Sequence, residues 1–306
     1  MTTASSSNII DGKQIAQEIR EEIRVAASAR VTAGQPPPGL AVILVGGRRD
    51  SQTYVNMKKK ACAAAGILSF GYDFDESVTE NELLQCVAKL NEDKQIHGIL
   101  IQLPLPSHLN QDVVLRAVNP AKDVDGLHPV NTAALQIYSG KDVMQAPFSI
   151  PCTPLGCLVL LDRSGVVLAG KHCVVLGRSQ LVGLPMARLL LGRDATVTIC
   201  HSKTVNPASI ASQADVVVAA VGRAGLVKAD WVKDGAVVID VGINSVDAVP
   251  AKEGGKNYKL VGDVDYESCA PKCSKITPVP GGVGPMTIAM LLRNTLRSCE
   301  RLTDGK

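Results

Sequence analysis

The sequence is poor in aromatic residues, because only five Tyr, three Phe and one Trp occur among 306 residues. A core for a chain of this length therefore has to be built from Val, Leu, Ile and Ala. The sequence also lacks any apolar run near the ~20 residues that a membrane-spanning helix needs. Its net charge of +3 is too small to indicate binding to nucleic acid or to a membrane surface. We therefore predict neither partner.

Metal-binding and secretory patterns are missing as well. The nine Cys residues contain no CxxC pair, and no His stands near the closest two, Cys269 and Cys273. We predict no metal and expect reduced thiols that act as small hydrophobic residues. The opening MTTASSSN has neither the charged nor the apolar region of a secretory signal, so we read it as a frayed start. A cytoplasmic location is expected, with a mitochondrial one left open.

Apolar runs of strand length alternate with helical patterns in two series, separated by an aperiodic stretch at 139–151 that predicts a linker. Because the strands are apolar on both faces, they indicate parallel sheets covered by helices. The expected strands are 40–45, 68–72 and 97–103, then 172–176, 196–200, 215–219 and 236–240. The expected helices are 12–30, 51–65 and one opened by the capping box Thr79–Glu82, then 183–192, 206–213 and a last one from Pro285.

One helix carries a candidate constellation. Ser51, Tyr54 and Lys58 recur at helical spacing and share one face of the helix at 51–65, whose start Asp50 or Ser51 can cap. A hydroxyl, an aromatic ring and an amine together could serve catalysis. The alternative is a half-buried aromatic beside a solvated lysine.

The second series contains a candidate dinucleotide turn between the strand at 172–176 and the helix that follows. The Rossmann fingerprint places Gly at 177, 179 and 182, but only Gly177 fits, since the other two positions hold Ser179 and Val182. Backbone N–H groups at the start of the helix can hold a phosphate. A plain strand-to-helix turn is the alternative.

The next strand ends in a segment that favours NADP. An NAD site usually has an acidic residue here to bind the ribose 2′-hydroxyl. This chain has Ser202 and Lys203 instead, with Arg178 nearby in such a fold. Hydroxyl and cationic donors suit a 2′-phosphate.

Seven motifs together resemble one family. In chain order they are TYVNMKKKA, QLPLP, KDVDGL, PCTP, GRSQLVGLP, CHSKT and TPVPGGVGPMT. Their order is similar to that in the bifunctional methylenetetrahydrofolate dehydrogenase/methenyltetrahydrofolate cyclohydrolase (FolD) family, over about residues 8 to 302. The unusual glycine turn is itself characteristic of that family.

The resemblance implies an α/β fold with two domains flanking a cleft. A folate-binding catalytic domain would comprise 1–149 plus 279–306, and an NADP-binding Rossmann domain with a doubly wound parallel sheet would comprise 150–278. It also implies a homodimer formed through the nucleotide-binding domain.

The same resemblance implies residue roles. Lys58 matches the lysine of the cyclohydrolase step, Gln102 its partner, Tyr54 the ring that packs on folate, and Asp125 the carboxylate that holds the pterin. Further folate contacts are implied at Ser51, Ile101, Leu103, Pro280, Gly281, Gly282, Val283, Pro285 and Thr287. Cofactor contacts are implied at Gly177, Arg178, Ser179, Ser202 and Ile243.

The implied activity is NADP-dependent oxidation of 5,10-methylenetetrahydrofolate to the methenyl compound, then hydrolysis to 10-formyltetrahydrofolate. Hydride transfer needs alignment rather than a side-chain acid or base, whereas hydrolysis needs help with protons, which Lys58 can supply. An NADP-dependent dehydrogenase of another small substrate would leave Tyr54, Lys58, Gln102 and the PGGVGPMT loop without a purpose. The alternative of a non-catalytic dinucleotide-binding protein is opposed by the intact Lys58 and the GRS turn.

Overall fold

The computed structural model describes residues 8–139, 142–247 and 258–304. The first seven residues, where we expected a frayed start, and residues 140–141 of the predicted linker lie outside these ranges. By its internal contacts the chain divides into two compact units. The Lys58 unit comprises Gln17–Cys152 and Ile288–Lys306, and the Gly177 unit comprises Met1–Ala16 and Thr153–Thr287. The predicted functional domains differ from this division at both ends of the chain, and those boundaries stay a prediction.

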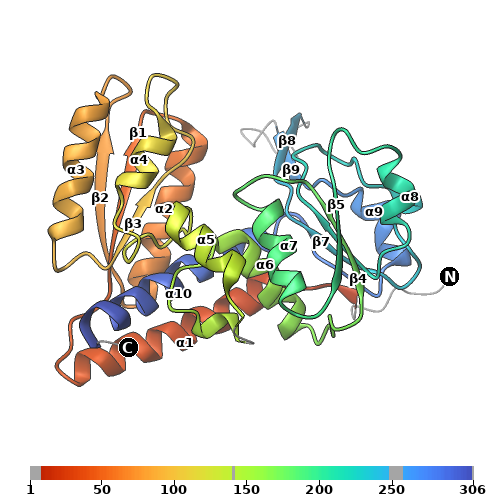
Figure 1. The fold of residues 1–306 in the computed structure, drawn as a ribbon, viewed down its shortest axis with the longest axis horizontal. Coiled ribbons are helices and arrows are strands. Elements are labelled where there is room, and N and C mark those ends of the chain that lie inside the picture. The colour runs from red at the N-terminus through yellow and green to blue at the C-terminus, as the bar shows by residue number, and fades with distance from the viewer. Residues whose placement is uncertain (1–7, 140–141, 248–257, 305–306) are drawn as a thin grey trace, which may run out of the picture. The chain divides into compact units, whose positions relative to one another are not determined.

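The Lys58 unit is built on a parallel three-stranded sheet in the order β2-β1-β3 (Figure 1). Its strands are β1 (Gly39–Val45), β2 (Leu68–Phe74) and β3 (Gly98–Ile101), close to the predicted ranges. Every residue of the central strand β1 is buried, as a strand covered on both faces requires. The edge strand β3 is buried as well, whereas the edge strand β2 is partly exposed. The helices of this unit are α1 (Gly12–Thr32), α2 (Arg49–Ala64), α3 (Glu80–Glu92), α4 (Gln111–Ala117), α5 (Pro129–Ile137) and most of α10 (Val283–Asp304).

Two helix starts in this unit tested the predicted caps. The capping box of α3 is present, because Thr79 and Glu82 exchange side-chain-to-backbone hydrogen bonds. The predicted cap of α2 was wrong. That helix begins at Arg49 after the N-cap residue Arg48, which makes no side-chain cap hydrogen bond, so Asp50 and Ser51 lie inside the first turn.

A single hydrophobic cluster joins the sheet to two of these helices. Ala41, Ile43 and Val45 point to one face of β1, as the two-residue period of a strand requires. On that face they pack with α3 and α4 residues, among them Leu83 and Val114. The cluster fixes the end of β1, where the chain turns into α2.

The Gly177 unit contains a parallel five-stranded sheet in the order β10-β7-β6-β4-β5. The strands are β4 (His172–Leu176), β5 (Thr196–Cys200), β6 (Val216–Ala219), β7 (Val237–Asp240) and β10 (Lys275–Ile276). Since the chain goes from β4 to β5 on one side and then to β6 on the other, the strand order reverses at β4, as in a doubly wound Rossmann-like sheet.

The remaining elements of this unit connect and cover that sheet. They are α6 (Cys152–Arg163), α7 (Gly183–Leu191), α8 (Pro207–Ala211), α9 (Tyr266–Cys269) and the antiparallel pair β8 (Asn244–Asp247) and β9 (Tyr258–Val261), with 3₁₀ turns at Ala229–Trp231 and Ala270–Lys272. In the Lys58 unit a further 3₁₀ turn, Val143–Gln145, lies within the predicted linker.

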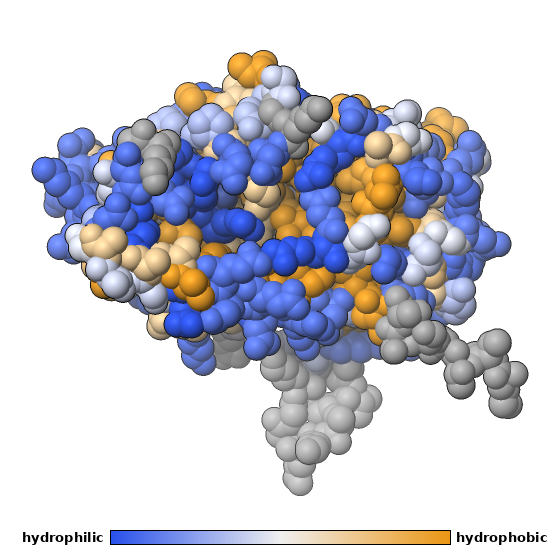
Figure 2. All heavy atoms as spheres, turned by 90° about the horizontal axis from the view of Figure 1, so that it is seen from below, coloured by the Kyte–Doolittle hydropathy of each residue, from blue (hydrophilic) through white to orange (hydrophobic). Residues whose placement is uncertain are grey.

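The Cys residues behave as predicted. All nine are free thiols, and eight of them are buried. In the described ranges no helix is both long and apolar enough for a membrane span. Hydrophilic residues occupy much of the face displayed in Figure 2, with hydrophobic ones between them.

Candidate functional site

The Lys58 amine is buried, which removes the alternative of a solvated lysine. Its side chain is 9% exposed on α2, and its Nζ donates a hydrogen bond of 2.9 Å to Oε1 of Gln102. Gln102 follows β3, and its Nε2 donates to the carbonyl of Leu103 at 2.9 Å. Its backbone N–H extends the sheet by donating to the Ile43 carbonyl. The carboxyl end of the sheet therefore fixes Gln102, and Gln102 in turn fixes the Lys58 amine.

Burial shifts the protonation of the amine and of a nearby carboxyl. Burial lowers the pKa of Lys58, and the negative charge of Asp125 opposes that shift. Burial raises the pKa of the half-buried Asp125, while the positive charge of Lys58 lowers it. The two groups are therefore close enough to influence one another. For each of them, burial favours the uncharged form more than water does.

The segment that carries Asp125 is held by its neighbours. The buried Asp123 carboxylate accepts from the backbone N–H groups of Gly126 and His128 at 3.0 and 2.8 Å, and from Nδ2 of Asn131 at 2.8 Å. Gly126 has a φ of +71°, and a Cβ there would strike the backbone of Ile150. Asp123 thus has a structural role, because it holds the backbone that directly follows Asp125.

Sequence reasoning missed two residues of this region, Asn294 and Cys152. Nδ2 of Asn294, on α10, donates to the carbonyls of Val124 and Ile150 at 2.9 Å each. The Cys152 thiol donates to the Val124 carbonyl at 3.4 Å. An amide side chain among the many apolar residues of the last predicted helix was the signal that could have revealed Asn294.

The other predicted folate contacts are divided between the two units. Ser51 is buried and Tyr54 half-buried on α2, and Ile101 and Leu103 flank Gln102, all in the Lys58 unit. The predicted loop residues belong to the Gly177 unit, where Thr287 and Thr153 pair their hydroxyls at 3.1 Å. In the structure Pro280, Gly281 and Gly282 lie in the loop, whereas Val283, Pro285 and Thr287 lie in the first turns of α10.

The turn after β4 requires glycine at two positions. Gly177 has a φ of +124°, and a Cβ there would strike the carbonyl of Ala220, which follows β6. Gly183 opens α7, and a Cβ there would strike the carbonyl of Gly177. The close approach that the fingerprint assigns to a glycine at 182 is therefore made one residue later, which is why the fingerprint match looked weak.

Three amides at the start of α7 have partners within the protein. We assigned phosphate binding to backbone N–H groups at the start of the helix. In the structure, the amides of Val182 and Gly183 donate to Oγ of Ser179 at 3.2 and 3.4 Å, and the amide of Leu184 donates to the Ser179 carbonyl. Because the short polar residue turns back on the helix start, these three donors already have partners within the protein.

The donor set beside β5 fits NADP. The backbone N–H of Gly177 donates to the carbonyl of Cys200, so the turns after β4 and β5 adjoin. Arg178, Ser202 and Lys203 are exposed there, and 201–206 contains no carboxylate. Ile243 is exposed between β7 and β8. A cationic, hydroxyl-bearing surface next to a glycine turn suits a nucleotide with a 2′-phosphate.

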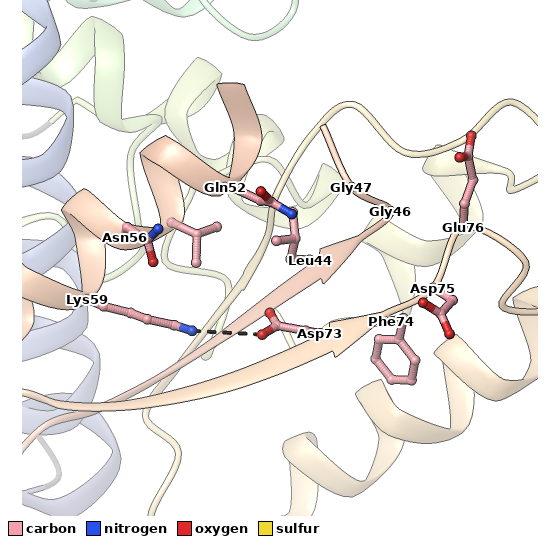
Figure 3. A pocket seen from close by; sticks show the side chains of 11 residues that line it. Leu44, Gly46, Gly47, Gln52, Asn56, Lys59, Asp73, Phe74, Asp75 and Glu76 are labelled. Atoms are coloured by element: carbon pink, nitrogen blue, oxygen red, sulfur yellow. Dashed lines mark ion pairs between the residues drawn. The ribbon is translucent and has the colours of Figure 1, made fainter. Parts of the chain in front are cut away.

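A cavity of about 540 Å³ lies beside α2, and Lys58 is not among its lining residues. Figure 3 shows the side chains that line it. Gln52, Asn56 and Lys59 line it from the helix, opposite residues from the ends of β1 and β2. Lys59 and Asp73 form an exposed ion pair at 4.0 Å across it, which contributes ~0–1 kcal/mol. None of the predicted site residues lines this cavity.

No group of three or more His, Cys, Asp and Glu side chains is arranged to hold a metal ion within residues 8–139, 142–247 and 258–304. A doubly wound nucleotide-binding sheet and a second α/β unit with a buried amine define a two-domain, nucleotide-dependent enzyme.

Comparison with known proteins identifies the family. Residues 10–125 match the catalytic domain of the tetrahydrofolate dehydrogenase/cyclohydrolase family, and residues 151–303 match its NAD(P)-binding domain. The chain belongs to this family, as its motifs indicated.

Individual relatives match over nearly the whole chain. The chain is 51% identical to bifunctional protein FolD 2 of Arabidopsis thaliana over 98% of this chain and 99% of that protein. The structure of the Trypanosoma brucei FolD enzyme, complexed with NADP cofactor and inhibitor, has a TM-score of 0.90 and 42% identity and covers 99% of each chain. The bifunctional FolD enzyme of Campylobacter jejuni has a TM-score of 0.88 and 45% identity, covering 96% of this chain and 99% of that one.

Proposed function

We propose that this protein oxidises 5,10-methylenetetrahydrofolate with NADP⁺ and hydrolyses the resulting methenyl compound to 10-formyltetrahydrofolate, with Lys58 moving the protons of the second step. Both domains of a bifunctional dehydrogenase/cyclohydrolase family are present. The observation that carries the proposal for Lys58 is its buried amine, held 2.9 Å from Gln102.

NADP⁺, when bound, supplies the hydride acceptor of the first step. For its binding we propose Gly177, Arg178, Ser179, Ser202 and Ile243, with Lys203 beside them. The glycine lets the chain pass close to the cofactor, and the cationic and hydroxyl groups would take the 2′-phosphate. Ser179 keeps the helix start in shape through its two hydrogen bonds.

In the dehydrogenase step the only role that we assign to the protein is to align the folate with the nicotinamide. A nitrogen lone pair of the substrate drives the hydride out of the bridging methylene group, so no side chain has to donate or accept a proton. Tyr54 would pack against the folate rings, and Ser51, Ile101, Leu103 and the 280–287 segment would complete the folate contacts.

Hydrolysis requires two proton movements. Water adds to the cationic methenyl carbon and forms a C–O bond, and Lys58 as a neutral amine accepts the proton that this water loses. The bond from that carbon to one ring nitrogen then breaks, and the ammonium returns its proton to the departing nitrogen. A second proton, from the hydroxyl that becomes the formyl oxygen, leaves to solvent. A lowered pKa of Lys58 makes the neutral amine available for this role.

Two residues would assist this amine. Gln102, itself oriented by Leu103, would keep Nζ in one place. Asp125 would accept neighbouring N–H groups of the pterin edge in parallel, which a carboxylate does well. The proposed catalytic group consists of Lys58 and Gln102, together with Asp125 and Tyr54, which would hold the folate.

An assay with two readouts tests the function. The enzyme is given 5,10-methylenetetrahydrofolate with NADP⁺ or NAD⁺, and NADPH and the methenyl compound are measured separately after an acid quench. We expect NADPH to form with folate saturation and NADP⁺ to be preferred. If neither nucleotide is reduced with this folate, the alternative hypothesis of a dehydrogenase that acts on another small substrate is favoured.

We also propose a cytoplasmic homodimer that pairs through the nucleotide-binding domain. A two-stranded ribbon is marginal by itself, and the β8–β9 pair exposes Tyr258 and Leu260. Analytical ultracentrifugation of the protein and of Leu260→Lys tests this, since a monomeric wild type would contradict it.

For the functional domains we propose 1–149 plus 279–306 as the folate-binding domain and 150–278 as the NADP-binding domain. NADPH titration of the isolated 150–278 segment would test those boundaries.

A further inference from the structure

The most extensively bonded carboxylate near the predicted nucleotide site is Asp263. It is fully buried between β9 and α9. Its Oδ2 accepts from the amides of Val221 and Gly222 at 2.6 and 2.9 Å. Its Oδ1 accepts from the amide of Arg223 and from Nδ2 of Asn244, each at 2.9 Å. One side chain thus holds three consecutive residues of the turn that follows β6.

A second carboxylate fixes the first. Asp240 ends β7 and is 3% exposed. Its Oδ1 accepts from the amides of Gly242 and Asp263 at 2.9 Å each, and its Oδ2 accepts from the amide of Val264 at 3.0 Å. A Cβ on Gly262 would strike the Asp240 carboxylate, and one on Gly242 would strike that of Asp263. These two glycines therefore allow both carboxylates to approach the backbone.

The turn that Asp263 holds lies against the glycine turn. Ala220, directly before it, donates its backbone N–H to the carbonyl of Leu176 at 2.8 Å. Its carbonyl is the atom that a Cβ on Gly177 would strike. Because β4 and β6 flank the point where the strand order reverses, these two turns border the crevice in which doubly wound sheets bind dinucleotides.

We propose that Asp263 is a positioning residue for the nicotinamide half of NADP, which it serves by fixing the 221–223 turn and, through Asn244, the segment next to Ile243. This inference rests on the proposed cofactor. With the adenosine ribose assigned to Ser202 beyond β5, an extended dinucleotide reaches across β4 towards β6.

The chemistry of a carboxylate explains why this position needs Asp. A carboxylate has only acceptors, and here four donors converge on it. An Asn of the same shape would turn an NH₂ group towards backbone N–H groups, so at least one donor would lose its partner. The turn would then move away from Gly177, while the Lys58 unit would keep its structure.

The test compares Asp263→Asn with wild type and with the control Asp234→Asn, an exposed carboxyl of the same unit. NADPH affinity is measured by fluorescence titration, and hydrolysis of methenyltetrahydrofolate is measured without nucleotide. We expect the Kd for NADPH to rise roughly tenfold or more in Asp263→Asn, since a buried donor loses its partner. Nucleotide-free hydrolysis should stay within about twofold of wild type, a pattern that general destabilisation would not produce.

A milder variant decides the matter if Asp263→Asn does not fold. Asn244→Ala removes one of the four donors and should raise the Kd about threefold. The inference would be overturned if a folded Asp263→Asn had an unchanged Kd for NADPH. If that variant is unfolded, an unchanged Kd in Asn244→Ala would overturn it. Failure of the wild-type protein to bind NADPH would overturn it as well. If wild type binds NADPH but does not turn over folate, the proposed function fails while the Kd comparison still tests Asp263.

Discussion

Lys58 and Asp263 are both buried charged residues, but the protein treats them in opposite ways. The Lys58 amine is held by Gln102, and burial lowers its pKa. The Asp263 carboxylate receives four donors within 2.9 Å. A group that has to change its protonation needs few strong partners, because each one would favour a single state. A group that has to hold a shape needs all of its acceptors filled.

The two units differ in the same way. In the Lys58 unit, the side chains of the candidate site come from separate elements and meet only where the strands end. In the Gly177 unit, the backbone does most of the shaping, through glycines at 177, 183, 242 and 262 that let carbonyls and carboxylates approach closely. We therefore expect side-chain variants in the first unit to change chemistry, and backbone variants in the second to change nucleotide binding.

The largest effect should follow loss of the amine. In Lys58→Met, hydrolysis of methenyltetrahydrofolate should fall by ~10²–10⁴-fold, the usual contribution of a proton-transferring group. NADPH formation from the methylene compound should persist, since that step needs alignment alone. Lys60→Met, an exposed neighbour on α2, is the control for both assays. Full hydrolysis in Lys58→Met would contradict the assignment.

The contrast between shape and protonation can be tested at Asp240. Burial raises the pKa of Asp240 from an ordinary 3.8 to about 6, against the three backbone donors that lower it. Because the folded state binds this proton more tightly, its stabilising contribution is complete below pH 3.8 and is lost as pH rises through about 6.

A shift of that size corresponds to ~3 kcal/mol. The difference in unfolding free energy between wild type and Asp240→Asn should therefore decrease from pH 4 to pH 6 and stay flat above it. Denaturant unfolding at several pH values measures this. A difference that grows with pH would contradict the raised pKa.

A backbone change should affect the Gly177 unit alone. Gly177→Ala places a methyl group against the Ala220 carbonyl at a φ of +124°, which costs about 1–3 kcal/mol of strain and displaces the turn. NADPH binding by titration should weaken about tenfold or more, while nucleotide-free hydrolysis should remain. Gly165→Ala has a φ of +71° but open space around its Cβ, so it separates the clash from the φ effect. If Gly177→Ala and Gly165→Ala weakened NADPH binding equally, the close approach of Gly177 to the Ala220 carbonyl would not be the cause.

The smallest effect expected is a shift in a pH profile. Gln102→Glu would place a carboxylate beside the Lys58 amine, which favours the ammonium form and raises the pKa of Lys58. The hydrolysis rate falls on the acid side as the amine becomes protonated, so that limb should move to higher pH by about one unit. Gln102→Met lacks the charge and should slow hydrolysis without the upward shift. An unchanged limb in Gln102→Glu would mean that another group sets it.

The sequence predicted the parallel sheets and the strands β1 to β7, because most of these strands are buried and read as uninterrupted apolar runs. It did not predict the two-residue strand β10 or the β8–β9 pair, which contain no such run. It also predicted the Thr79–Glu82 capping box, which is a local arrangement of four residues. Likewise the motifs identified the family and the NADP-type donor set at Ser202 and Lys203, since residue type alone carries that information.

Other features depended on contacts between distant residues. The sequence misassigned the start of α2. It also did not show that amides at the start of α7 bond to Ser179, because a free N–H and a bonded one look the same in a sequence. It did not reveal that Asn294 supports the Val124 carbonyl across 170 positions, or that Asp263 organises a turn 40 residues earlier. By itself the sequence determined which elements form and which chemical groups are available. Only the tertiary structure decided that Lys58 is buried beside Gln102 and that Asp263 faces four donors, because burial and hydrogen-bond partners arise when separate elements pack together.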